Sequence, residues 1–164
     1  MRIACSLGSL LSVEEVIQCT ELVSKTGIDS IWIPETWGME NFSMLGAVAN
    51  KTKTQKIGSS IINIYSRSPS TIAMGSATTD TLSNGRLILG LGTSSVPIVE
   101  DFHGEKFENP VQRMREYVEI IRLSLMKKQI NYSGNIFNLK NFTLLIEPKR
   151  KSIPIYLAAI NEKM

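Results

Sequence analysis

The chain has 164 residues, of which 43% are hydrophobic and 20% are charged. This composition indicates a globular protein and excludes disordered, collagen-like and coiled-coil classes, and the length predicts a single domain over residues 1–164. The net charge of +3 is too small for the concentrated basic surface of a nucleic-acid-binding protein. We interpret the only basic run, at 149–151, as a solvated loop.

Cysteine usage and hydropathy exclude two further classes. Cys5 and Cys19 belong to no CxxC motif or Cys/His cluster, so we expect reduced thiols and neither a zinc site nor a disulfide framework. No apolar stretch reaches the roughly 18 residues that a membrane-spanning helix needs. We therefore expect a cytoplasmic protein without a leader peptide and without a membrane partner.

The chain begins with an apolar run at 2–7, which predicts a strand. A helical pattern follows. Ser12 and Glu15 form a capping box at its start, and Gly27 is placed to end it. Residues 29–34 predict a second strand. The opening of the chain is therefore a strand, a helix and a strand.

The same alternation continues through the next segments. Residues 42–51 carry the apolar spacing of a helix, and 56–65 form a near-continuous apolar run. Such a run suits a strand buried on both faces, as parallel sheets require. Pro69 is placed at the first position of a third helix, with Ser68 as its N-cap, and this helix extends to about Leu82.

The second half of the chain adds two strands, a helix and a hairpin. Asn84-Gly85 predicts a left-handed end to the third helix, and 86–91 predict a fourth strand. A loop then leads to Pro110, which opens a fourth helix. Turn residues within 130–147 predict an inserted hairpin, and 153–160 predict a fifth strand.

This order predicts an α/β fold with a parallel sheet and outer helices, either closed as a barrel or open as a doubly wound sheet. In both architectures the functional residues follow the carboxyl ends of the strands. The rule selects Ser6 and Gly8 after the first strand, Glu35 and Thr36 after the second, Asn63 within the third, and Gly92, Thr93, Ser94 and Ser95 after the fourth.

The glycines of the fourth strand allow two interpretations. Gly90 and Gly92 begin like a dinucleotide-binding fingerprint, but Ser95 stands at the third glycine position and Pro97 argues against a helix opening there, so a Rossmann site is disfavoured. In one interpretation, Gly90 lets a helix approach the strand and Gly92 bends the chain. In the other, backbone N–H groups and hydroxyls of the loop hold a polar ligand ring.

Three polar residues have both a structural and a functional interpretation. The amide of Asn63 must find hydrogen-bond partners, either in loop backbone or in a cofactor. Glu35, close to Trp37, is a candidate to move protons, or else it caps a helix or forms a salt bridge. His103, the only histidine, has no nucleophile elbow to serve, so we expect a structural role. One histidine and scattered carboxylates predict no metal site.

Four motifs in this order resemble the bacterial-luciferase-like superfamily, and together they cover essentially the whole chain. Within the superfamily they look most like coenzyme F420-dependent reductases of the methylene-tetrahydromethanopterin reductase type. The motifs are IWIPETWG at 31–38, GSSIINIYSRSP at 58–69, NGRLILGLGTS at 84–94, and HGEKFENP at 103–110 followed by Arg113-Met114-Arg115-Glu116.

The resemblance implies a TIM-type (β/α)8 barrel with about five of its eight strands present and a hairpin insertion before the fifth. It implies hydride transfer between coenzyme F420 and a carbon substrate such as a methylene-tetrahydropterin. Glu35 matches the acidic position and is the catalytic candidate. An irregularity of the third strand, a bulge or a non-proline cis peptide, is implied near 62–64. With the residues that the strand-end rule selects, the cofactor-binding candidates are Ser6, Thr36, Asn63, Gly92, Thr93, Ser94 and Ser95.

Two positions depart from the family pattern. Thr36 stands where some members have a proton-donating histidine, and Ser95 stands where some have a glutamate. These departures disfavour a sugar-phosphate dehydrogenase mechanism, and they leave Glu35 as the candidate acid.

Two alternatives remain open: an FMN-dependent luciferase-like monooxygenase, and a noncatalytic flavin-binding or subunit-interaction protein. The expected partners are a small-molecule substrate and a second copy in a homodimer or homo-oligomer. Barrels of this type usually need about 250 residues and often bind phosphate after strands seven and eight. We therefore expect residues 1–164 to be the N-terminal part of a barrel, with phosphate-binding residues beyond 164 and weak or absent cofactor binding.

Overall fold

The computed structural model describes residues 1–8, 10–126 and 129–159. Its elements confirm the predicted alternation of strands and helices, with a hairpin before the last strand. In chain order they are β1 (Ala4–Ser6), α1 (Val13–Val23), β2 (Ser30–Ile33), α2 (Asn41–Lys51), β3 (Lys56–Ser59), β4 (Ile62–Asn63), α3 (Pro69–Leu82), β5 (Leu87–Gly92), η1 (Ile98–Phe102), α4 (Pro110–Met126), β6 (Gln129–Ser133), β7 (Asn138–Thr143) and β8 (Ile155–Leu157).

Two predicted helix starts and the predicted end of α3 are confirmed, but the prediction that Gly27 ends the first helix is wrong, because α1 ends at Val23 and a turn joins it to Gly27. Ser12 Oγ accepts the N–H of Glu15 at 3.2 Å, and Glu15 Oε2 accepts the N–H of Ser12 at 2.7 Å, so the capping box of α1 is complete. Ser68 caps α3 in front of Pro69. After α3, Asn84-Gly85 adopts φ values of 54° and 80°, which is the left-handed helix end that the sequence predicts.

The sheet is parallel, and β5 lies between the edge strand β8 on one side and β3 with β4 on the other. Its strand order is β1-β2-β3-β5-β4, and β8 pairs with the other edge of β5. The prediction of one continuous strand over 56–65 is wrong, because β3 and β4 pair in turn with the same edge of β5. Ile57 is opposite Leu87 and Ile62 is opposite Leu91. This strand therefore carries one more residue than β5 over the same stretch, as in a bulge.

The irregularity implied near 62–64 lies just before that position. The peptide bond between Ser60 and Ile61 is cis, and these two residues separate β3 from β4. Gly92, opposite Asn63 in the register, leaves room for the Ile61 side chain, because a Cβ on Gly92 would lie 2.6 Å from it.

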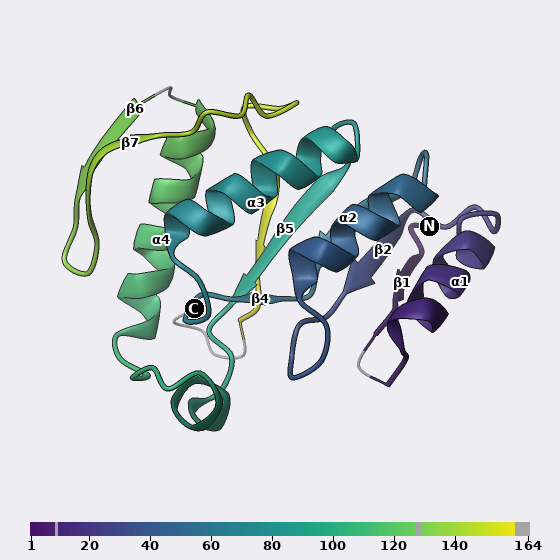
Figure 1. Ribbon diagram of the computed structural model, residues 1–164, viewed down its shortest axis with the longest axis horizontal. Coiled ribbons are helices and arrows are strands. Elements are labelled where there is room, and N and C mark those ends of the chain that lie inside the picture. The colour runs from purple at the N-terminus through teal and green to yellow at the C-terminus, as the bar shows by residue number, and fades with distance from the viewer. Residues whose placement is uncertain (9, 127–128, 160–164) are drawn as a thin grey trace.

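The helices α1 to α4 lie in succession along one face of the sheet (Figure 1). The core lies between these two layers and consists of branched side chains of the strands and of the inner helix faces, with Ile31, Ile33, Ile57, Ile62, Leu87, Leu89 and Leu91 buried on the sheet side. No described helix covers the opposite face, and β1 and β8 each pair on one side only among the described strands. The α/β parallel fold is confirmed, and the described strands form an open sheet.

Two segments differ from the expectations. The loop expected before Pro110 contains the π-helical turn η1, held by the fully buried Val99. The strand expected at 153–160 is limited to Ile155–Leu157, and its expected end at residue 160 lies outside the described residues. None of the described helices combines the length and hydropathy that crossing a membrane requires.

The basic run at 149–151 is only partly a solvated loop. Lys149 and Lys151 are exposed, but Arg150 donates to the fully buried carboxylate of Asp80, with Nη2 at 2.5 Å and Nε at 3.0 Å from Oδ1. The interpretation as a solvated loop is therefore wrong for Arg150. A buried carboxylate needs a partner, and Arg150 supplies it to Asp80 of α3.

The inserted hairpin is attached to α4 through one buried side chain. Glu116, 1% exposed, accepts the backbone N–H groups of Asn135, Ile136 and Phe137 at 2.9 to 3.2 Å. Gln112 also donates to Glu116, at 2.8 Å. The turn between β6 and β7 therefore wraps its backbone around a carboxylate of the adjacent helix.

Candidate functional site

The carboxyl ends of the parallel strands bring the predicted site residues to one edge of the sheet. Ser6 ends β1 opposite Trp32 of β2, and Asn63 ends β4 opposite Gly92 of β5. Glu35 lies two residues after the end of β2. Register alone therefore places residues from four separate segments along the same edge.

Asn63 has a buried donor without a partner. The side chain is 4% exposed, and its Oδ1 accepts the N–H of Tyr65 at 2.9 Å. Its Nδ2 has no hydrogen-bond partner among the described residues. A buried donor left unpaired costs about 1–3 kcal/mol, so this amide is ready to bind an acceptor. The loop backbone satisfies the oxygen of Asn63 and leaves the nitrogen free.

Glu35 and Arg67 form a two-pronged ion pair. Arg67 Nη1 lies 2.8 Å from Glu35 Oε2, and Nη2 lies 2.5 Å from Oε1. The same Nη2 donates to Glu40 Oε1 at 2.5 Å, and the Arg67 side chain is 16% exposed. Glu35 Oε1 also accepts the N–H of Asn41, the first residue of α2. Of the interpretations that the sequence left open, the salt bridge and helix-end contacts of Glu35 are present.

Glu40, the second carboxylate bound by Arg67, also caps a helix. Glu40 caps α2 by accepting the N–H groups of Phe42 at 3.1 Å and Ser43 at 2.8 Å. Its burial raises the pKa of the carboxyl, and hydrogen bonds from Ser43 and Phe42, with the charge of Arg67, outweigh burial and lower the pKa overall. Arg67 therefore lies between two carboxylates and carries its positive charge with an even higher pKa than usual, chiefly through its hydrogen bond to Glu35.

The other candidate residues supply hydroxyls and space. Ser94 is exposed and has a φ of 59°, and Ser95 is exposed beside it, while Thr93 is half-buried. Ser6 and Thr36 are also exposed. The structure therefore brings Asn63 and the loop 92–95 together through paired strands, and it leaves Thr36 as a surface hydroxyl.

Gly90 of β5 does not have the first of the two roles that the sequence left open for it. Gly90 faces β3 and not a helix: Ser59 Oγ accepts its N–H at 2.7 Å and donates to its carbonyl at 2.9 Å. A Cβ on Gly90 would collide with the Ser59 carbonyl oxygen. The interpretation that Gly90 admits a helix is therefore wrong.

Among the described residues no group of three or more His, Cys, Asp or Glu side chains gathers as a metal site.

His103 has the contacts of a packing residue. It ends the η1 turn and lies edge-on to Phe102, with ring centroids 5.0 Å apart. Its N–H donates to the carbonyl of Ile98 at 3.1 Å. These contacts hold the loop between β5 and α4, and no serine or cysteine nucleophile is paired with the ring in the described hydrogen bonds.

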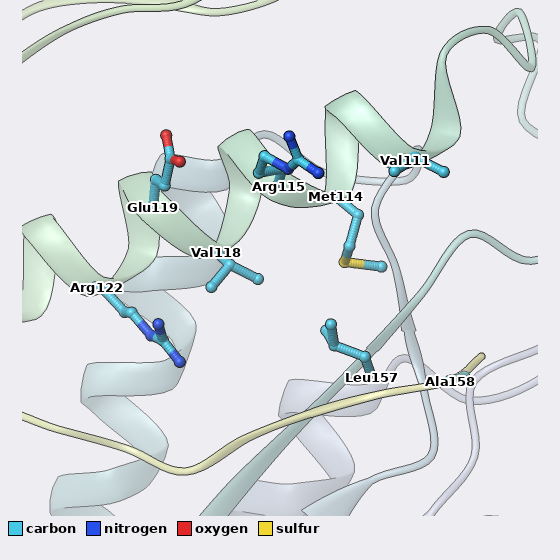
Figure 2. A pocket seen from close by; sticks show the side chains of 8 residues that line it. All are labelled: Val111, Met114, Arg115, Val118, Glu119, Arg122, Leu157 and Ala158. Carbon is cyan, nitrogen blue, oxygen red and sulfur yellow. The ribbon is translucent and has the colours of Figure 1, made fainter. Parts of the chain in front are cut away.

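Two hollows lie away from this edge. One, of about 350 Å³, lies between α4 and β8 on the helix side of the sheet, as Figure 2 shows, and is lined by Val111, Met114, Arg115, Val118, Glu119, Arg122, Leu157 and Ala158. The other, of about 530 Å³, is lined by Trp32, Tyr156 and residues at the amino ends of the strands. Neither is lined by a predicted site residue.

Sequence reasoning missed Arg67. The residue lies in the polar turn Ser66-Arg67-Ser68, between a strand end and a helix cap, where a solvated arginine is the usual outcome. Its carbonyl accepts the Tyr117 hydroxyl at 2.5 Å, and its guanidinium lies 5.8 Å from the centre of the Phe42 ring. The signal in the sequence was the pair of acidic residues five apart, Glu35 and Glu40, around a helix start.

Comparison with known proteins identifies the family. A family model described as luciferase-like monooxygenase matches residues 1–164. The chain belongs to the luciferase-like monooxygenase family. Its fold agrees: the coenzyme F420-dependent tetrahydromethanopterin reductase of Methanopyrus kandleri superposes with a TM-score of 0.88 at 23% identity, covering 98% of this chain and 50% of that one.

Two curated relatives of this family member are similar over most of its length. The 5,10-methylenetetrahydromethanopterin reductase of Archaeoglobus fulgidus is 38% identical over 145 residues, which are 88% of this chain and 43% of the relative. A putative coenzyme F420-dependent oxidoreductase of Mycobacterium tuberculosis is 32% identical over 149 residues, 84% of this chain and 43% of the relative. The chain thus spans less than half the length of these relatives.

Proposed function

We propose that this chain acts in the cytoplasm as part of a coenzyme F420-dependent oxidoreductase that transfers a hydride between the deazaflavin and a carbon substrate such as a methylene-tetrahydropterin. The 38% identity to a methylenetetrahydromethanopterin reductase supports the reaction class. The free donor of Asn63 at the strand ends supports the place where the cofactor binds.

The residues at the strand ends fit a flat, polar-edged cofactor. Asn63 offers a buried N–H to an acceptor on a ring, and Ser94 and Ser95 offer exposed hydroxyls. Gly92 lets the Ile61 side chain pack against the strand end. We propose that Ser6, Thr36, Asn63 and the loop 92–95 hold the cofactor. When bound, the deazaflavin supplies the hydride acceptor or donor, and the chain supplies binding and orientation.

Glu35 is the proposed acidic residue of the site. In the structure both of its oxygens accept hydrogen bonds, from Arg67 and from the N–H of Asn41. In this arrangement it serves as a charged acceptor beside the proposed ring site. Exchange of a proton with substrate requires that Arg67 release one of these oxygens.

An FMN-dependent monooxygenase is the second candidate. The family description names monooxygenases, and a structural neighbour is a Baeyer-Villiger monooxygenase in complex with FMN, with a TM-score of 0.80. We also propose a homodimer or homo-oligomer, the assembly that the family resemblance implies.

Titration with each cofactor distinguishes the two candidate functions. The pure chain is titrated with F420 and with FMN while cofactor absorbance and fluorescence are followed, for the wild type and for Asn63→Ala. For residues 1–164 we expect weak F420 binding, because the phosphate-binding residues are expected beyond 164, and we expect Asn63→Ala to weaken it further by about three- to tenfold, the contribution of one hydrogen bond. Asn50→Ala, on an exposed face of α2, is the matched control. Tight FMN binding with none for F420 would overturn the proposal.

A further inference from the structure

Arg67 connects three elements around the candidate site. Its guanidinium holds Glu35 after β2 and Glu40 at the start of α2. Its backbone carbonyl accepts the hydroxyl of Tyr117, which reaches across from α4 and is 1% exposed. One residue therefore fixes the loop that carries Glu35, the first turn of α2 and the middle of α4 relative to one another.

A short chain of hydrogen bonds leads from Arg67 to Asn63. Arg67 Nη1 donates to Ser66 Oγ at 3.1 Å, and Ser66 Oγ donates to the Asn63 carbonyl at 2.8 Å. The N–H of Ser66 donates to the same carbonyl at 3.3 Å. Asn63 in turn accepts the N–H of Tyr65 with its side chain. Moving the guanidinium therefore disturbs the turn that aims the amide of Asn63.

We propose that Arg67 is a positioning residue for the cofactor site, and that Glu35 acts as its anchor. In this arrangement the Glu35–Arg67 pair holds the turn 63–67 so that the free Nδ2 of Asn63 is already aimed when a ligand arrives. This inference rests on the proposed function, because the site that Arg67 positions is the proposed cofactor site.

The burial of the pair favours this role over a surface salt bridge. The side chains are 16% and 11% exposed, and the contact uses both guanidinium nitrogens and both carboxylate oxygens. Such a fork is specific to arginine, because lysine offers one point charge without the planar geometry. A surface pair such as Lys51 with Glu21, 44% and 46% exposed, has no comparable constraint.

The test uses the Tyr65 amide as a local reporter. That N–H is bonded to the side chain of Asn63, so its hydrogen-exchange rate reports whether the amide stays in place. Arg67→Lys and Glu35→Gln are measured by NMR without any ligand, and the Tyr65 rate is divided by that of the Leu89 amide in β5, which bonds to Pro154. The ratio removes a general loss of stability.

Arg86→Lys is the matched control. Arg86 is also a half-buried arginine, but it lies at the amino end of β5 and donates to carbonyls of Ala49, Thr52 and Gln55. We expect Arg67→Lys and Glu35→Gln to raise the Tyr65 ratio at least tenfold and to weaken F420 binding at least tenfold. We expect Arg86→Lys to leave both unchanged while lowering the overall stability.

The outcomes separate this inference from the proposed function. An unchanged Tyr65 ratio in Arg67→Lys overturns the positioning role, whatever the chain binds. A Glu35→Gln chain that loses turnover while keeping its Tyr65 ratio and its F420 affinity also overturns it, because Glu35 then acts on the substrate and not through Arg67. If the Tyr65 ratio rises but the wild type binds FMN alone, the positioning role is supported and the F420 assignment is overturned.

Discussion

Asp80 and Arg150, seventy residues apart, form an ion pair in which the carboxylate is fully buried and the guanidinium is 32% exposed. The same guanidinium donates to the Leu87 carbonyl at 2.5 Å, so Arg150 joins α3, β5 and the segment that leads to β8. A fold built from consecutive units is thus also tied together by a long-range contact.

Removing the Arg150 side chain should leave the Asp80 carboxylate buried without its charged partner, with only the backbone N–H of residue 150 donating to it, at 3.1 Å. We expect Arg150→Ala to lower the free energy of unfolding by roughly 3 kcal/mol, the lower end of the cost of breaking a buried pair, because this guanidinium is one-third exposed. Chemical denaturation checks the value. The control is Lys51→Ala, whose surface pair with Glu21 should contribute little. Equal losses in the two variants would contradict the importance of the buried pair.

Glu116 should make the stability of the chain depend on acidity. Burial alone raises the pKa of its carboxyl, but hydrogen bonds from Gln112 and from the backbone of 135–137 outweigh burial and hold the pKa below its ordinary value of 4.5. The folded state therefore binds fewer protons than the unfolded state. Its contribution is present above the ordinary pKa and is lost as pH falls through the lowered one.

The measurement compares unfolding of the wild type and Glu116→Gln from pH 7 down to about 3. At pH 7 we expect Glu116→Gln to be less stable by about 1–3 kcal/mol, since the single amide oxygen cannot accept from all four donor groups. The difference should shrink towards low pH, where the wild-type carboxyl is protonated too. A difference that stays constant across this range would show that charge is not the cause.

Two helical glycines should respond in opposite directions to the same change. At Gly75 of α3, a Cβ would lie 2.6 Å from the Phe42 ring of α2, so Gly75→Ala must push the helices apart and should cost about 1–3 kcal/mol. At Gly46 of α2, the nearest atom is the Leu82 methyl at 3.7 Å, an ordinary contact. Gly46→Ala should therefore stabilise the chain by about 0.5–1 kcal/mol through helix propensity. Thermal unfolding of both variants checks the two signs: a lower melting temperature for Gly75→Ala and a higher one for Gly46→Ala.

Ser59 should stabilise the fold through its two hydrogen bonds to Gly90. Its hydroxyl is fully buried and both accepts the N–H and donates to the carbonyl of Gly90. Ser59→Ala leaves that N–H unpaired in the sheet, and we expect a loss of about 1–3 kcal/mol in denaturation. Thr78→Ala, which removes an exposed helical hydroxyl, serves as the comparison. If both variants unfold alike, the strand contact is not the cause.

The local features of the fold could be predicted because neighbouring residues determine them. The capping box of Ser12, the proline start at Pro69 and the left-handed end at Asn84 depend on a few adjacent residues, and all are present. The division of 56–65 into two strands was not predictable in this way. It depends on the register against β5, and the apolar pattern is the same with or without one extra residue.

The candidate site was predictable in its place and not in its contacts. The strand-end rule selected Asn63 and the loop 92–95, which the register brings together. It did not select Arg67, since an arginine in a polar turn finds its carboxylates only after β2 and α2 have packed. For the same reason Arg150, in a basic run, gave no sign of the buried Asp80.

The attachment of the hairpin to Glu116 depends on the backbone of the turn more than on the identity of its residues. The turn contributes peptide N–H groups, which every residue except proline carries, so the contact requires a backbone path and few particular side chains. Gly134 is the exception, because a Cβ there would collide with the Glu116 carboxylate. Substitutions in the turn that keep its backbone path and Gly134 should therefore leave the attachment to α4 intact, whereas the strands are also held by particular side chains, such as Ile130, which is buried, and Tyr132, whose hydroxyl donates to Glu119.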